Sequence, residues 1–97
     1  MRKDLRELAD QIILGGAELA AVSERGITFN NFREEEGTLF VEVLCGIEIL
    51  ANLYKIKNVN IEDAIVRLED YGICFYQYVA EDKRKEVFYK LLLGNVK

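Results

Sequence analysis

Residues 32–57 read FREEEGTLFVEVLCGIEILANLYKIK, and this stretch decides the class of fold that we expect. On a helical projection of about 100° per residue, its apolar side chains form a stripe about half the circumference wide. The stripe consists of Phe40, Val43, Leu44, Ile47, Leu50, Ala51 and Tyr54. Asn31 is a candidate N-cap, and the acidic residues 34–36 suit the first turn of a helix. We therefore predict one long helix over residues 32–57.

The rest of the chain shows the same helical period. Apolar residues spaced three and four apart predict a helix over residues 3–22, with Gly15-Gly16 in its middle and a connector over 23–31. After Asn60, a further apolar stripe predicts a third helix from residue 61. Residues 83–93 form either a short fourth helix or the end of one bent helix over 61–93. The predicted fold is therefore all-α, a single small antiparallel helical bundle over residues 1–97.

Composition restricts the possible chemistry. The 97 residues are 51% hydrophobic and 31% charged, the balance of one globular domain. The chain contains no His, which excludes Ser-His and Cys-His catalysis and histidine metal ligands. Only Ser23, Thr28 and Thr38 carry aliphatic hydroxyl groups. We therefore expect no catalytic residue, no metal and no cofactor, and we do not expect an enzyme.

The net charge of −4 is unevenly distributed along the chain. Residues 31–82 carry four basic and eleven acidic side chains, a net −7, whereas residues 83–97 carry five basic and one acidic, a net +4. An acidic body disfavours nucleic acid as a partner. The basic end also contains Phe88 and Tyr89, which supports a lesser alternative, a nucleic-acid-associated or regulatory protein. The asymmetry itself favours head-to-tail association of chains or a docked C-terminus.

Cysteine usage and hydropathy indicate neither an extracellular nor a membrane protein. Cys45 and Cys74 lie in apolar surroundings without C-x-x-C spacing, which predicts two buried, reduced and inert thiols. Acidic residues follow the first basic residues too closely for a signal peptide. Glu42 and Glu48 interrupt the most apolar stretch, so we expect no transmembrane helix and no membrane partner. A cytoplasmic protein is the expectation.

Carboxylates are the most plentiful reactive groups. Glu35 and Glu42 are seven residues apart with Thr38 between them, and the pairs Glu62-Asp63 and Glu69-Asp70 repeat that spacing. Such stripes on adjacent helices are either solvated faces, which we expect, or a site for a divalent cation.

One family resemblance involves these carboxylates. Residues 41–65, an apolar helix followed by Asn60-Ile61-Glu62-Asp63-Ala64-Ile65, resemble the second half of the all-α MazG-like nucleotide pyrophosphohydrolases. The resemblance covers about a quarter of the chain. It implies a metal-binding E-x-x-D pair, but Cys45 stands where a pair beginning at Glu42 would have Asp. As a lesser alternative it implies release of pyrophosphate from nucleoside triphosphates, dependent on Glu35 and Glu42.

The predicted helix over residues 32–57 is apolar around most of its girth. Its polar side also contains the apolar residues Val41, Ile49 and Leu53. The helix must therefore bury apolar surface on more than one side, and we expect a second copy of the chain to provide the additional contact. We therefore predict a non-enzymatic protein–protein interaction or assembly module, a homodimer or a binder of another protein. The expected contact residues are Phe40, Ile47, Ile49, Leu50, Leu53 and Tyr54.

Overall fold

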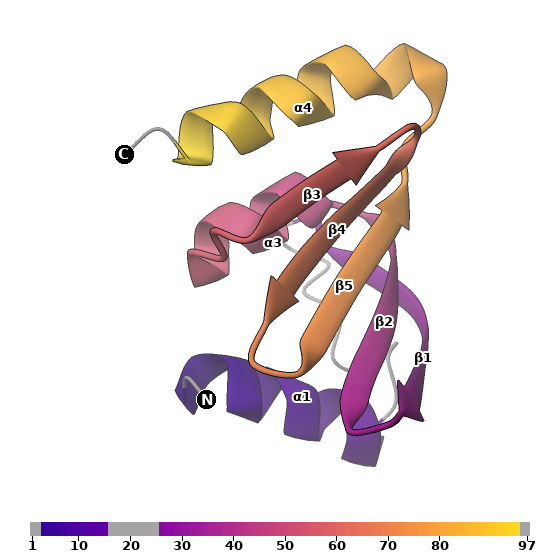
Figure 1. Ribbon diagram of the computed structural model, residues 1–97, viewed down its shortest axis with the longest axis vertical. Helices are drawn as coiled ribbons and strands as arrows, with labels where there is room; N and C mark the ends of the chain where they lie inside the picture. The colour runs from indigo at the N-terminus through magenta and orange to yellow at the C-terminus, as the bar shows by residue number, and fades with distance from the viewer. Residues whose placement is uncertain (1–2, 16–25, 96–97) are drawn as a thin grey trace.

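The computed structural model describes residues 3–15 and 26–95 and is an α+β fold, not an all-α bundle (Figure 1). In chain order the elements are α1 (Lys3–Gly15), β1 (Thr28–Glu35), β2 (Thr38–Cys45), α3 (Ile47–Tyr54), β3 (Val59–Glu62), β4 (Ile65–Asp70), β5 (Ile73–Tyr78) and α4 (Glu81–Asn95). The strands form one sheet in the order β1-β2-β5-β4-β3. Strands β2 and β5 are parallel, and the other neighbouring pairs are antiparallel.

Tight turns explain why the predicted helices over 32–57 and from residue 61 are wrong in large part. Glu36-Gly37 joins β1 to β2 with φ angles of 50° and 82°, and Tyr71-Gly72 joins β4 to β5 with φ angles of 43° and 83°. Two successive positive φ angles are the mark of type I′ turns, whose twist matches that of the flanking strands. Asp63-Ala64 is the corresponding short connection between β3 and β4. Each of these segments is therefore a hairpin.

The helical predictions hold at the two ends of the chain. Helix α1 confirms the first helix over residues 3–15, whereas its predicted continuation to residue 22, with Gly16, lies outside the described residues. Helix α4 confirms a separate helix over 83–93, so the single bent helix over 61–93 is wrong. Only α3 remains of the long helix predicted over 32–57. Asn31 and Asn60 lie in strands and are not N-caps.

All three described helices pack on one side of the sheet (Figure 1). Alternate strand residues point to that side, which we call the core face, because successive side chains of a strand point to opposite faces. The core face and the helices share one cluster of buried apolar residues, which includes Leu5, Ile12, Phe29, Val41, Ile47, Leu50, Leu68, Phe75 and Leu91. At its centre the rings of Phe29 and Phe75 stack with centroids 6.1 Å apart. Burial of this face therefore holds the two layers together.

The junction between β2 and α3 depends on two residues. Gly46 has a φ of 90°, and a Cβ at this position would collide with the carbonyl oxygen of Gly26. Since α3 begins without a cap from Gly46, the backbone N–H of Ile47 donates a hydrogen bond to Oε1 of Gln77, 3.0 Å away. Gln77 is a buried polar side chain of the core face, and it satisfies one of the donors left free at the start of the helix. This bond fixes α3 above β5.

Candidate functional site: the open face of the sheet

The second face of the sheet carries no covering element among residues 3–15 and 26–95 (Figure 1). We call it the open face. Its side chains are Asn31, Arg33 and Glu35 on β1, Thr38, Phe40, Glu42 and Leu44 on β2, Asn60 and Glu62 on β3, Ile65, Arg67 and Glu69 on β4, and Cys74, Tyr76 and Tyr78 on β5. Phe40 and Tyr76 are half-buried at its centre, whereas Leu44 and Tyr78 are exposed. The open face therefore has an aromatic centre where a solvated sheet face has polar residues.

Strand register assembles this centre in two rows across the sheet. In one row Arg33 pairs with Phe40, and Phe40 pairs with Cys74 on the parallel strand β5. In the next row Glu42 pairs with Tyr76, which in turn pairs with Arg67 on β4. Paired residues of neighbouring strands point to the same face. The register thus places one arginine on each side of the aromatic pair.

Arg33 has three partners on or beside the open face. Its guanidinium carbon lies 4.6 Å from the centroid of the Phe40 ring, a cation–π contact. Its Nη1 donates a hydrogen bond to the hydroxyl of Tyr76 at 3.3 Å, and its Nε lies 3.4 Å from a carboxylate oxygen of Glu35. The Tyr76 hydrogen bond, followed by the charge of Glu35, raises the pKa of Arg33 further above its ordinary value. These three contacts favour the orientation in which the charged guanidinium lies over Phe40.

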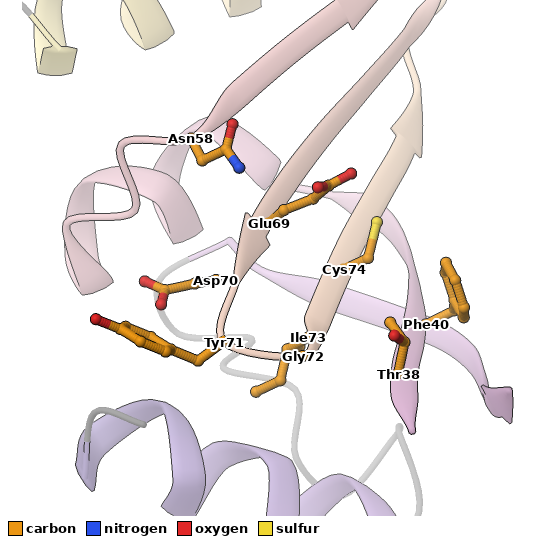
Figure 2. A pocket seen from close by; sticks show the side chains of 9 residues that line it. All are labelled: Thr38, Phe40, Asn58, Glu69, Asp70, Tyr71, Gly72, Ile73 and Cys74. Atoms are coloured by element: carbon orange, nitrogen blue, oxygen red, sulfur yellow. The ribbon is translucent and has the colours of Figure 1, made fainter. Parts of the chain in front are cut away.

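Two shallow hollows, which share Phe40, Glu69 and Cys74, lie along the open face. One, of about 460 Å³, is lined by Arg33, Phe40, Ile65, Arg67, Glu69, Cys74 and Tyr76. The other, of about 360 Å³, extends toward the β4–β5 turn (Figure 2). Figure 2 shows Phe40 and Cys74 projecting from one side of the sheet, and Asp70 and Tyr71 from the opposite side. The surface is therefore a broad, gently hollowed sheet face, not a deep cleft.

Cys74 lines both hollows and is buried. Burial, aided by the charge of Glu69, raises the pKa of its thiol. A protonated thiol is a weak nucleophile, so Cys74 acts as a small apolar residue at neutral pH. The prediction of a buried, unpaired thiol is confirmed for Cys74, and Cys45 is also free. The predicted burial of Cys45 is wrong, since its side chain is exposed.

The carboxylates do not form a metal site in the described part of the chain. Glu35, Thr38 and Glu42 do share one face, but as residues of the β1–β2 hairpin and not of a helix. Within residues 3–15 and 26–95, no group of three or more Cys, Asp or Glu side chains is placed to hold a metal ion. The all-α fold implied by the pyrophosphohydrolase resemblance is overturned, because residues 41–65 contain the strand β3 and parts of β2 and β4 as well as the short helix α3. The resemblance therefore carries no functional argument.

The six predicted contact residues lie on two different sides of the sheet. Ile47 and Leu50 are fully buried in the core, so they are not available to a partner in this fold. Ile49 and Tyr54 are half-buried against the core, and Leu53 is 37% exposed on α3. Phe40 alone belongs to the open face.

Sequence reasoning missed Arg33, Arg67 and Tyr76 as residues of a common surface. Arg67 and Glu69 alternate with the buried Val66 and Leu68, and this alternation is the pattern that could have placed them on one face of a strand. Recognition of the Tyr71-Gly72 turn would have supported the same interpretation, because an X-Gly pair between such runs indicates a hairpin.

The fold defines a two-layer α+β protein with helices on one face of a mixed sheet. Comparison with models of protein families, with curated proteins and with solved structures found no match to this chain. None of the helices described over residues 3–15 and 26–95 is long and apolar enough to cross a membrane. Any functional conclusion therefore depends on the open face itself.

Proposed function

We propose that this chain is a non-enzymatic assembly module, acting in the cytoplasm, that associates with further copies of itself through the open face. The observation that carries the proposal is the pair Phe40 and Tyr76, half-buried on a face that no described element covers. Exposed aromatic surface is retained where it serves a contact, since its burial in a complex releases free energy.

The composition of the open face supports a protein contact. Aromatic residues and arginine are enriched at protein interfaces and lysine is depleted there. The open face has Phe40, Tyr76 and two arginines, and none of its side chains named above is a lysine. Because its three partners favour one orientation of Arg33, ordering of this side chain on binding costs less than it would for an unpartnered arginine.

The test is the molar mass in solution, measured by light scattering over a tenfold range of concentration. We expect the wild-type mass to rise above the 11.2 kDa of one chain. Phe40→Glu, on the open face, should return the mass to that of a monomer, because it places a charge in the contact. Leu53→Glu, on α3, is the matched control and should leave association unchanged. Circular dichroism should show both variants folded.

The opposite pattern would contradict the proposal. Association that survives Phe40→Glu and is lost in Leu53→Glu would place the contact on α3, as the helical stripe predicted. A wild-type chain that stays monomeric across the whole range would reject self-association altogether.

A nucleic-acid-associated role has weaker support. Aromatic and arginine side chains on a sheet are a combination that stacks single-stranded bases. Within the basic segment, however, Arg84 donates to the carbonyl oxygen of Val79 at 3.0 Å and Phe88 packs against the core. With a net charge of −4, we expect no binding of labelled single-stranded RNA by fluorescence anisotropy at physiological salt. Tight binding that weakens steeply with salt would favour this role instead.

A further inference from the structure

Helix α4 carries apolar side chains on two opposite faces. Val87 and Leu91 are buried in the core cluster. Tyr89, Leu92 and Leu93, spaced as i, i+3 and i+4, form a stripe on the other side and are 63%, 61% and 52% exposed. A helix that serves only as a surface helix has a polar outer face. We call these three residues the outer stripe.

Helix α4, which carries the outer stripe, and the open face have net charges of opposite sign. Lys85 and Lys90 are exposed on the same helix, where Lys90 pairs with Glu86, and residues 81–95 carry four basic and three acidic side chains, a net +1. The open face and its rim carry Glu35, Glu42, Glu62 and Glu69 against two arginines. A helix with a small net positive charge is thus opposite in sign to an open face whose rim is acidic, and both carry apolar side chains at their centre.

Their dimensions also agree. The 15 residues of α4 make a helix about 22 Å long. Five strands about 4.8 Å apart give a sheet about 19 Å across between its outer strands. One helix can therefore lie over the full width of the open face and supply the layer that this side of the sheet lacks.

We infer that the outer stripe of one copy docks on the open face of the next copy, an inference that rests on the proposed function. Helix α4 and the open face lie on opposite sides of the sheet, so one pair of copies cannot make the contact twice (Figure 1). Each added copy therefore leaves one open face and one outer stripe free. Such a head-to-tail contact produces open chains of copies, not a closed dimer.

The alternative contact between two copies of the chain is sheet against sheet. It would bring two faces together that each carry four carboxylates and two arginines. Because both faces carry a net negative charge, electrostatic repulsion opposes this pairing. It would also leave the outer stripe in water.

A complementation experiment separates the two arrangements. The variant Phe40→Glu has a defective open face and an intact outer stripe, whereas Leu92→Glu has the reverse. Each variant alone should be monomeric. Their equimolar mixture should form a 1:1 complex of about 22 kDa, twice the mass of one chain, and nothing longer. Leu14→Glu, at an exposed apolar residue of α1, is the control and should assemble like the wild-type chain.

Each other outcome overturns the inference. If Leu92→Glu alone still forms dimers, the open faces pair with each other, and the proposed function stands without the head-to-tail contact. If the mixture stays monomeric while the wild-type chain associates, a different surface mediates assembly. A wild-type chain that is monomeric at every concentration rejects the proposed function together with the inference.

Discussion

Phe75 and Tyr76 are neighbours on β5, yet they have opposite surroundings. Phe75 is buried on the core face and stacks on Phe29. Tyr76 is half-buried on the open face, where Arg33 donates a hydrogen bond to its hydroxyl. One strand therefore contributes to the core through one face, while its other face is free for the contact that we propose. We also predict that substitutions on the two faces have separable effects on folding and on assembly.

The largest difference is expected between alanine substitutions at these two neighbours. Phe75→Ala removes a ring from the core and should lower the free energy of unfolding by about 3–5 kcal/mol. Tyr76→Ala, on the half-buried open face, should lower it by only about 1 kcal/mol. Urea unfolding followed by circular dichroism measures both. Equal losses would show that the open face is part of the stabilising core.

The second largest difference in the free energy of unfolding is expected between alanine substitutions at two glycines with similar φ angles. Gly46→Ala combines a φ of 90° with a collision against the backbone of Gly26, and we expect a loss of about 2–3 kcal/mol. Gly37→Ala, at a φ of 82° in an open hairpin turn with nothing nearby, should lose about 1 kcal/mol. Thermal unfolding of both variants checks the order, and the reverse order would mean that the approach of Gly26 to Gly46 is not a constraint.

Substitution of Gln77, the buried polar residue of the core face, should have a moderate effect on the free energy of unfolding. Gln77→Met keeps the length of the side chain but removes the acceptor for the N–H of Ile47. A buried donor without a partner should lower the free energy of unfolding by about 1–2 kcal/mol. Hydrogen exchange at the Ile47 amide should accelerate more than exchange at Val41 in β2. Unchanged protection at Ile47 would contradict the capping role.

The smallest effect concerns an exposed ion pair on α4. Nζ of Lys90 lies 3.1 Å from a carboxylate oxygen of Glu86, and this hydrogen bond lowers the pKa of Glu86. The pair's contribution is therefore fully present above the ordinary pKa of a glutamate, and it is lost as pH falls through the lowered pKa of Glu86. A carboxyl NMR titration should show the pKa of Glu86 rising in Lys90→Met and unchanged in the control Lys85→Met. No rise in Lys90→Met would exclude the pair in solution.

The errors of the helical prediction lie mainly in the central strands. Phe40 and Leu44 on the open face make β2 apolar on both faces. Apart from Glu42, residues 39–44 are therefore all apolar, and they fit a broad helical stripe as well as a buried strand. The prediction overlooked two turns that divide these segments into hairpins, Glu36-Gly37 and Tyr71-Gly72. No such turn interrupts α1 or α4, and this is why helices were correctly predicted over the described residues of these two segments.

Local features of this protein follow directly from its residues. The sequence specifies the amphipathic helices α1 and α4, the X-Gly turns and the absence of histidine chemistry. Only the tertiary structure decided that β2 lies parallel to β5, which brings Arg33 to Tyr76 across 43 positions of the chain. The physical reason is that local periodicity acts within a few residues, whereas strand order depends on which distant apolar faces are buried together. The candidate site is a product of that long-range pairing.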